Sequence, residues 1–257
     1  MVICLSANQP FHAAELAVVI DDVGYNKARG LRAVNLPGPV TIAVLPFAPH
    51  TNMLAQMAVN RGHDVIVHQP MEGRPSEKNL EEHGTLKLHM HANDFDSALN
   101  AALEAIPQSV GLSNHTGSLL TAHQDPMRRV MVQLRSRDLF FLDSRTTADT
   151  VAHAVAREQG VPALRRDVFL DHDPRPEAIQ AAFQKALRIA RRQGHAVIIG
   201  HPYGNSLTFL ETRLADMPKD IALVSAGALV RQSPPVSHQV VLARQPGPTS
   251  PHISLGQ

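Results

Sequence analysis

Residues 17–24, AVVIDDVG, constrain the fold of this chain most, because a strongly apolar run ends there in two adjacent carboxylates and a glycine. The β-branched residues of this run predict a buried strand, which places Asp21 and Asp22 at its carboxyl end. In α/β folds, ligands and catalytic groups collect at that edge of the sheet. Two neighbouring carboxylates repel each other, and burying them is costly unless a cation or a proton intervenes. A divalent metal ion would resolve this conflict.

Five other apolar runs along the chain end in the same way, on an aspartate or a histidine. They span residues 64–72, 110–118, 139–146, 168–173 and 196–202, and they deliver His68, His115, Asp143, Asp171 with His172, and His201, respectively. A single polar residue after a strand is usually a helix cap or part of a turn. Six endings of this kind together favour one site to which all six strands contribute.

Helical segments alternate with these strands. Apolar residues at helical spacing, aspartate–proline pairs at helix starts and glycines after helix ends predict four helices, over residues 52–61, 94–106, 125–137 and 173–192. An apolar strand follows each of them. This alternation predicts an α/β fold, a parallel barrel or partial barrel in one domain over residues 15–231.

The composition fits an enzyme and narrows the class of partner. With 257 residues and 44% hydrophobic content, the chain can bury one large core. A net charge of +1 gives no electrostatic case for nucleic-acid binding. The absence of Trp and the presence of only 2 Tyr argue against a broad aromatic sugar-binding face. The single Cys4 excludes an internal disulfide and a cysteine-based zinc site.

The two ends of the sequence have a different character from the rest. Residues 1–14 combine a short apolar stretch with small residues, as in the remnant of an export signal, and predict a periplasmic or secreted protein, with a cytoplasmic location still open. No stretch approaches the roughly 20 apolar residues that span a bilayer. Residues 232–257 carry several prolines among polar residues without periodicity, which predicts a disordered tail.

The segments IDDVG, HQPME, SNHTGS, FLDSRT, VFLDHD and IGHP together resemble the motifs of the metal-dependent polysaccharide deacetylases, the NodB-homology enzymes, and most closely their divergent branch. The resemblance covers nearly the whole predicted domain. It implies a distorted parallel (β/α) barrel of about seven strands. It also implies one divalent metal ion, usually zinc, held by one aspartate and two histidines. The implied activity is hydrolysis of N-acetyl groups on amino-sugar polymers of the cell envelope, with a polysaccharide or oligosaccharide as substrate.

The resemblance assigns the first two acids different roles. Asp21 corresponds to the general base of the family and Asp22 to a metal ligand. His68 corresponds to the first metal-binding histidine of the second motif. In that motif a second histidine usually follows four residues later, and this chain has Glu72 there.

Two residues are candidates for the remaining metal ligand. Either Glu72 supplies an oxygen atom, or His115 supplies the missing imidazole. We favour His115, because Gly111 and Gly117 flank it in a polar loop where no packing role is evident.

His201 matches the final histidine motif of the family and would protonate the leaving amine. Asp171 or Asp143 would hold this imidazole in one tautomer and raise its pKa. Arg145 would pair with Asp21 and keep it ionised. An ordinary salt bridge between Arg145 and another nearby acid, Asp149 or Asp167, explains that arginine equally well.

Two other classes of function stay open. The chain could be a catalytically degenerate barrel that binds a glycan or a metal without turnover, which the replacement at Glu72 would allow. It could also be another metal-dependent hydrolase, such as a phosphoesterase, with the same Asp and His ligands. The sequence has no glycine-rich phosphate loop and no arginine cluster near the proposed site, which argues against the phosphoesterase.

Overall fold

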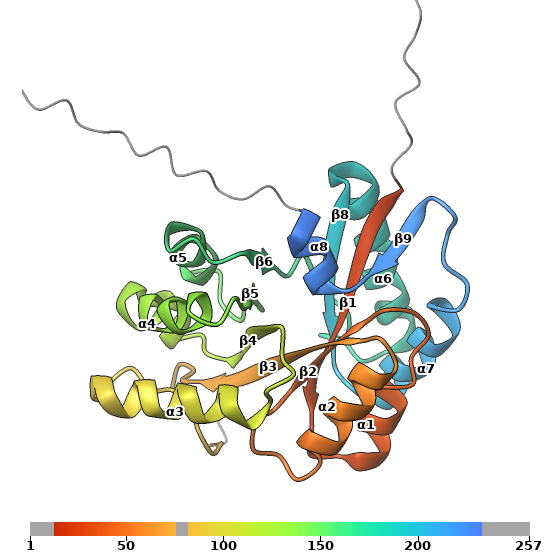
Figure 1. Ribbon diagram of the computed structural model, residues 1–257. Coiled ribbons are helices and arrows are strands. Elements are labelled where there is room, and N and C mark those ends of the chain that lie inside the picture. Colours follow the sequence, from red (N-terminus) through yellow and green to blue (C-terminus); the bar gives the residue numbers. More distant parts are fainter. Residues whose placement is uncertain (1–12, 76–81, 233–257) are drawn as a thin grey trace, which may run out of the picture.

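The computed structural model describes residues 13–75 and 82–232, and within them one parallel sheet curls into a half-barrel with helices packed around it (Figure 1). The strands are β1 (Ala14–Val23), β2 (Thr41–Val44), β3 (Asp64–Met71), β4 (Gly111–Thr116), β5 (Phe140–Asp143), β6 (Ala163–Arg165), β7 (Val168–Phe169), β8 (His195–Gly200) and β9 (Ile221–Val224). The helices are α1 (Lys27–Ala33), α2 (Thr51–Asn60), α3 (Ala92–Ala105), the 3₁₀ helix η1 (Leu120–Ala122), α4 (Gln124–Arg135), α5 (Ala152–Glu158), α6 (Pro176–Gln193), α7 (Gly204–Arg213) and α8 (Ala226–Gln232). The expected export-signal remnant, up to residue 12, and the expected tail, from residue 233, lie outside the described residues.

The strand order is β6-β5-β4-β3-β2-β1-β8-β7, with β9 beside β1. Residues 14–17 of β1 pair with β9, and residues 19–23 pair with β2. Within the described residues no strand pairing joins β6 to β7, so the barrel is open there. This architecture confirms the distorted parallel (β/α) barrel in a single domain. The sheet has nine strands where about seven were expected. The short strands β2, β6 and β9 are not among the six runs that end on an aspartate or a histidine.

Alternating side chains of the strands build two apolar cores. In β1, Val18 and Ile20 belong to the core between the sheet and the surrounding helices, which we call the outer core. Ala17 and Val19 belong to the core inside the half-barrel, the inner core, to which α8 also contributes. Because both faces of the sheet are covered, most strands are apolar without interruption.

The four expected helices are present as α2, α3, α4 and α6, with bounds that differ from the prediction by at most three residues. The largest difference is at α6, which begins with Pro176 because Asp173 accepts hydrogen bonds from Arg175 before the helix starts. Gly194 ends α6 in the left-handed conformation, as expected. No helix in the described part of the chain is both long and apolar enough to cross a membrane.

His63, immediately before β3, is a buried histidine that bridges two backbone segments. Its Nδ1 accepts a hydrogen bond from the Val40 N–H at 3.3 Å, and its Nε2 lies 3.1 Å from the carbonyl oxygen of Val34. Both bonds form when the ring is neutral and carries its proton on Nε2. Burial lowers the pKa of His63 below its ordinary value of 6.5.

We expect His63 to make the folded state less stable in acid. As the pH falls through about 6.5, the unfolded chain binds a proton at this residue and the folded chain resists it, so the free energy of unfolding decreases. Urea denaturation of the wild type and of His63→Gln between about pH 5 and pH 8 checks this prediction. The difference between their free energies of unfolding at each pH removes the contribution of the other histidines. At the alkaline end the substitution should cost about 1–3 kcal/mol. The exposed His195→Gln is the control, and a difference that stays constant with pH would contradict the prediction.

Candidate metal centre

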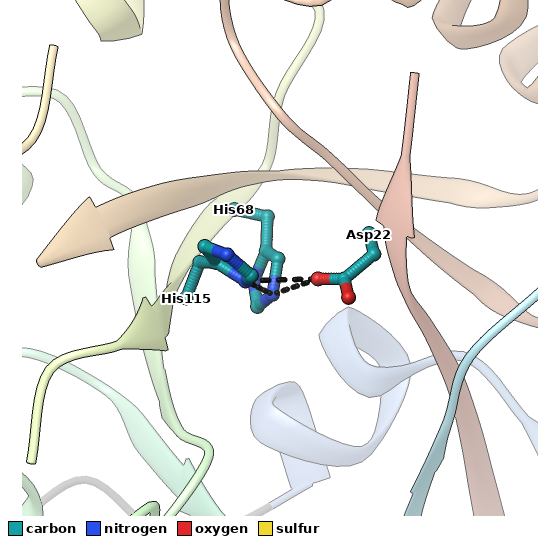
Figure 2. A group of neighbouring side chains, drawn as sticks. All are labelled: Asp22, His68 and His115. Atoms are coloured by element: carbon teal, nitrogen blue, oxygen red, sulfur yellow. Dashed lines mark hydrogen bonds and ion pairs between the residues drawn. The ribbon is translucent and has the colours of Figure 1, made fainter. Parts of the chain in front are cut away.

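Three side chains meet at the carboxyl end of the half-barrel: Asp22 of β1, His68 of β3 and His115 of β4 (Figure 2). Asp22 Oδ1 lies 2.8 Å from His115 Nδ1 and 3.2 Å from His68 Nε2. The two ring nitrogens lie 3.2 Å apart. The structure thus brings together the aspartate and the two histidines that we predicted as metal ligands.

The pleat of the strands explains most of this convergence. Asp21 continues the series of β1 residues that face the inner core, and His68 continues the same series in β3. Asp22 has the opposite parity, yet its carboxylate reaches the two rings because its backbone φ is 56°. Aspartate tolerates this left-handed conformation better than most residues, although it still carries some strain. The backbone conformation at the end of β1 therefore directs the side chains of both Asp21 and Asp22 toward the two histidines.

Each histidine of the group has a polar partner on the nitrogen that faces away from Asp22. His68 Nδ1 lies 2.7 Å from Ser113 Oγ, and His115 Nε2 lies 3.3 Å from Glu82 Oε1. Ser113 and His115 are two residues apart on β4 and so share one face of that strand. This strand therefore supplies one candidate ligand and also the partner of the other.

The contacts within the group favour a negative charge on Asp22 and a positive charge on the His115 ring. Burial opposes ionisation of Asp22, but its close contacts with the rings of His115 and His68 hold the pKa of Asp22 well below its usual range. Burial likewise disfavours a charged His115, but its contacts with Asp22 and Glu82 raise the pKa of His115 to about 10. The three side chains together hold a proton firmly, and the same electrostatic attraction favours a metal cation in its place.

The donor atoms fit a small divalent ion. A tetrahedral zinc ion with bonds of about 2.0–2.2 Å separates its ligand atoms by roughly 3.3 Å, and two of the three separations here are 3.2 Å. Asp22 Oδ1 is buried and, despite its short contacts, makes no well-directed hydrogen bond. One carboxylate oxygen with two imidazole nitrogens suits zinc and also admits cobalt, nickel or manganese. Asp22, His68 and His115 can therefore hold one divalent metal ion.

Asp21 lies beside this group without joining it. Its Oδ2 is 3.5 Å from His68 Nε2, and its Oδ1 is buried with no hydrogen-bond partner among the described residues. Burial raises the pKa of Asp21, against the opposing attraction of His68 and His201. A carboxylate with a raised pKa and an unpaired oxygen is suited to accept a proton.

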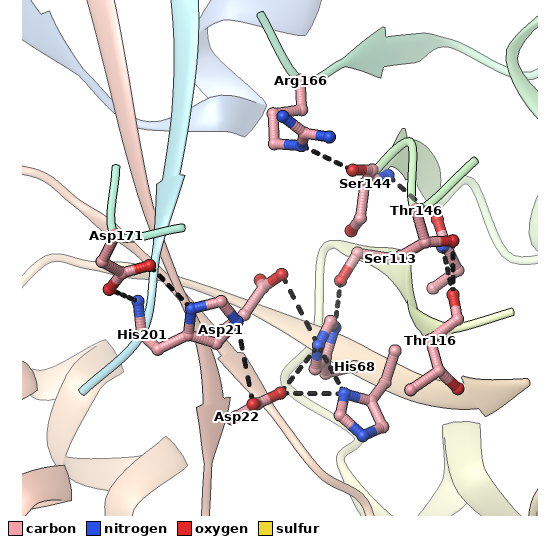
Figure 3. Close-up of polar contacts among 12 residues, drawn as sticks. Asp21, Asp22, His68, Ser113, Thr116, Ser144, Thr146, Arg166, Asp171 and His201 are labelled. Atoms are coloured by element: carbon pink, nitrogen blue, oxygen red, sulfur yellow. Dashed lines mark hydrogen bonds and ion pairs between the residues drawn. The ribbon is translucent and has the colours of Figure 1, made fainter. Parts of the chain in front are cut away.

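His201 follows β8 and approaches Asp22 from the side opposite the other two histidines (Figure 3). Its Nε2 lies 3.7 Å from Asp22 Oδ2, and its Nδ1 lies 2.9 Å from Asp171 Oδ1. The buried Asp171 also accepts hydrogen bonds from the His201 backbone N–H and the Ser206 hydroxyl, both at 2.7 Å. These bonds fix the carboxylate, and the carboxylate in turn orients the imidazole.

Two aromatic rings pack against the His201 imidazole. The ring centroids of Phe169 and Tyr203 each lie 5.2 Å from that of His201, and the Tyr203 ring is nearly parallel to it. Burial alone would lower the pKa of His201, but hydrogen bonding to Asp171 and the charge of Asp22 raise it. The ring is thus fixed in position and favours its protonated form.

Asp143, the other candidate partner of His201, lies elsewhere. Its Oδ1 accepts a hydrogen bond from the Arg145 N–H at 2.9 Å, and its Oδ2 accepts one from the Thr150 hydroxyl at 3.0 Å. Asp143 therefore stabilises the turn after β5, and the residue that contacts His201 is Asp171.

Glu72, the other candidate ligand, also lies apart from the metal group. Its Oε2 accepts a hydrogen bond from the Leu88 N–H at 2.6 Å. This carboxylate is committed to a loop, and the nitrogen that faces Asp22 and His68 belongs to His115.

Arg145 makes no ion pair within the described residues, neither with Asp21 nor with the two other acids considered for it. Its side chain is exposed, and its backbone adopts a φ of 50°. Asp149 pairs with Arg74, and Asp167 accepts a hydrogen bond from a backbone N–H of β8. The contribution of Arg145 to this region is its backbone, which closes the turn that begins at Asp143.

Arg166, between β6 and β7, is a half-buried arginine that interacts electrostatically with Asp143, Asp21 and Asp167, and our sequence analysis missed it. Its guanidinium donates hydrogen bonds to the carbonyl oxygens of Ser144 at 2.6 Å and Arg145 at 2.7 Å. It also lies 4.7 Å from the centroid of the Phe169 ring. The only sequence signal was a pair of arginines between two very short strands, which does not reveal the direction of either side chain.

A set of hydrogen bonds ties the end of β4 to the loop after β5 (Figure 3). Asn114 Oδ1 accepts a hydrogen bond from the Ser144 N–H at 2.9 Å, and Asn114 Nδ2 donates to the carbonyl oxygen of Thr116 at 2.8 Å. The Thr146 hydroxyl donates to the same Thr116 oxygen at 2.9 Å. Because Thr116 follows His115 directly, these bonds fix the backbone next to a candidate ligand.

Comparison with known proteins finds both a family and relatives for this chain. The model of the divergent polysaccharide deacetylase family matches residues 18–230. An uncharacterized protein of Haemophilus influenzae is 37% identical over 243 residues, which cover 93% of this chain and 86% of the relative. The uncharacterized protein YibQ of Escherichia coli is 36% identical over 228 residues, which cover 89% of this chain and 71% of the relative.

Two solved structures share the fold. The uncharacterized protein ATU2773 from Agrobacterium tumefaciens C58 superposes with a TM-score of 0.81 at 24% identity, covering 86% of this chain and 91% of that one. The peptidoglycan deacetylase PdaC from Bacillus subtilis superposes with a TM-score of 0.51 at 13% identity, covering 85% of this chain and 92% of that one. At these identities the similarity concerns the fold.

We expect the two adjacent acids to differ in metal binding. Asp22→Asn should weaken the affinity for a divalent ion by more than about 100-fold, because it removes a ligand charge, while Asp21→Asn should leave it nearly unchanged. Zinc titration against a competing chelator measures both, with the exposed Asp125→Asn as control. Equal losses in the two variants, or a metal-loaded structure whose ion contacts none of Asp22, His68 and His115, would refute this assignment.

We also expect Ser113 to support His68. Ser113→Ala leaves Nδ1 of that ring without its partner, and partners of this kind typically contribute about 10–100-fold to metal affinity. The same zinc titration should show a loss near the lower limit, because the partner is neutral. The exposed Ser136→Ala should bind zinc normally, and an unchanged affinity in folded Ser113→Ala would count against the assignment.

Proposed function

This chain belongs to the divergent polysaccharide deacetylase family, as its motifs predicted, and we propose that it is a metal-dependent hydrolase that removes N-acetyl groups from amino-sugar polymers of the cell envelope. We propose zinc as the metal ion. The observation that carries the proposal is the position of Asp22: one of its oxygens faces His68 and His115, and the other faces His201. A metal-binding group and a candidate acid thus lie on opposite sides of one carboxylate.

The residues divide the chemistry of amide hydrolysis between them. When bound, a divalent ion would activate a water molecule and polarise the amide carbonyl. Asp21 accepts the proton that the attacking water loses, because its free Oδ1 is buried beside the metal group. His201 gives a proton to the amide nitrogen as the C–N bond breaks. Asp171 contacts Nδ1 of this ring and so keeps Nε2 of His201 directed at the site. The products are acetate and the free amine of the sugar.

Arg166 has an electrostatic part in this proposal. A raised pKa makes Asp21 a better base, but a neutral carboxylic acid could not act as one. Electrostatic attraction between Arg166 and Asp21 favours the ionised form of that carboxylate. The ionised carboxylate is the form that accepts the proton of the attacking water.

We propose a substrate outside the cytoplasm, in the periplasm or at the cell surface. The support is the export-signal character of residues 1–14 and the family description of polysaccharide substrates. Peptidoglycan fragments are a suitable first substrate, because a protein of the same fold is named for that activity. Chitin oligomers offer the same N-acetyl group without the peptide.

Release of acetate tests the proposed function. We expect the zinc-loaded protein to release acetate from one of these amino-sugar polymers, and we expect chelation to abolish the release and zinc to restore it. Saccharide binding without acetate would favour a binding barrel that has lost turnover. Hydrolysis of phosphate esters in place of amides would favour a different metal-dependent hydrolase.

We expect His201→Ala to lower kcat by about 10²–10⁴-fold while the bound metal remains, because a general acid contributes about that much. The rate of the wild type should fall at alkaline pH as His201 loses its proton, and this limb of the profile should disappear in the variant. Asp171→Asn should shift the alkaline limb to lower pH, since the charge of Asp171 raises the pKa of His201. A His201→Ala enzyme with near-normal kcat would exclude this residue from the mechanism.

A further inference from the structure

We propose that Glu82 is a positioning residue of the metal centre, which directs Nδ1 of His115 to the metal and places a second negative charge next to the site. Glu82 Oε1 lies 3.3 Å from His115 Nε2, and His115 Nδ1 lies 2.8 Å from Asp22 Oδ1. One imidazole therefore joins two carboxylates through its two nitrogens. The side chains of His115 and Glu82 are only 18% and 17% exposed, so solvent screens this contact weakly.

The loop that carries Glu82 is held along the end of β3 by consecutive hydrogen bonds. Gln69 Nε2 donates to the carbonyl oxygen of Gly84 at 2.8 Å, and the Leu86 N–H donates to the carbonyl oxygen of Pro70 at 2.9 Å. The Glu72 N–H then donates to Leu86 O at 2.9 Å. These bonds fix the loop immediately after Glu82 relative to the strand that carries His68.

Side-chain packing fixes the same part of the loop. Gly84 has a φ of 80°, and a Cβ at this position would lie 2.4 Å from Cε2 of the Phe47 ring. The ring of His83 meets Phe47 edge to face, with centroids 4.7 Å apart. Only glycine allows this close approach, so the backbone two residues after Glu82 has little freedom.

Glu72, the residue at the position of the usual second histidine, supports this loop and not the metal. Its carboxylate accepts the hydrogen bond from the Leu88 N–H, and its carbonyl oxygen accepts bonds from the N–H groups of Leu119 and Leu120. It thereby connects the loop of Glu82 to the segment that follows His115. The carboxylate at this position acts on the site indirectly, through the two segments that it joins.

The chemistry of imidazole explains why His115 needs such a partner. A ring that binds a metal through Nδ1 carries its proton on Nε2, and an acceptor at Nε2 fixes that tautomer and makes Nδ1 a stronger donor. His68 has only the neutral Ser113 hydroxyl in the corresponding place. Glu82 and Asp22 place a carboxylate at each nitrogen of this ring, and acidic groups next to the site favour a bound divalent cation. The two histidines are therefore unequal ligands, and Glu82 strengthens the one that comes from β4.

The test is metal affinity in the full chain, without substrate, so its outcome does not depend on whether the protein hydrolyses amides. We expect Glu82→Gln, which keeps the shape and removes the charge, to weaken zinc affinity by about 10–100-fold in a chelator competition. Glu82→Ala should weaken it at least as much. The exposed Glu104→Gln on α3 is the matched control and should bind zinc like the wild type. Thermal unfolding of the metal-free variants verifies that each one is folded.

A second measurement reports the tautomer directly. In zinc-loaded protein labelled with ¹⁵N, we expect the His115 ring to carry its proton on Nε2 and its metal on Nδ1, and in Glu82→Ala we expect a fraction of the protein to bind zinc through Nε2 of this ring. Zinc affinity of Glu82→Gln equal to that of Glu104→Gln would overturn the proposal. So would a metal-loaded protein whose ion binds His115 through Nε2.

Discussion

Two adjacent carboxylates at the end of β1, one buried and one half-buried, are the constraint on which the rest of this site depends. Asp21 is 3% exposed, and Asp22 has an oxygen that solvent does not reach. Two such charges side by side would be strongly unfavourable in an apolar interior. Three imidazoles from the neighbouring strands offset this cost: His68 from β3, His115 from β4 and His201 after β8. The histidines at the strand ends therefore share one role, which is to stabilise the carboxylates of β1 electrostatically.

The same constraint separates the roles of the two acids. Asp22 contacts two imidazole nitrogens directly, and its pKa falls; Asp21 is more deeply buried with fewer partners, and its pKa rises. Neighbouring residues with the same side chain thus have opposite protonation tendencies, because one lies within the ligand group and the other beside it. Pairs of acids with divergent pKa values are a usual way to combine a permanent anion with a proton acceptor in one site.

The alternation of helices and strands was sufficient to predict the fold, and the strand ends were sufficient to predict most of the cluster. Asp21 and His68 lie in strands, and His201 directly follows one, whose alternation of side chains points these three residues to the interior of the half-barrel. The same reasoning could not place Asp143, because Phe140, Phe141 and Leu142 are all apolar and buried. A strand without alternation does not indicate which of its side chains point into the half-barrel and which point to the helices.

Loops were the part that sequence patterns could not resolve. Arg166 and Glu82 lie in segments without periodicity, so nothing in their neighbours indicates the direction of either side chain. Arg145 drew attention because it follows Asp143 closely, yet only its backbone takes part in the turn. Glu72 was identified as a departure from the family motif, but its partner, the backbone of Leu88, is reached only through the folded loop.

The position of His115 shows how a metal group can persist when one of its expected ligands is replaced. The loop position that usually carries the second histidine holds Glu72, and an imidazole from the adjacent strand β4 completes the group of three donor atoms. What the site requires is three donor atoms at suitable separations, and parallel strands offer several chain positions that meet this requirement. A left-handed Asp22 and an unpaired Asp21 oxygen both cost stability, and apolar or neutral residues would avoid that cost. Because the chain keeps both features around a complete donor set, the geometry favours chemistry over a purely structural barrel.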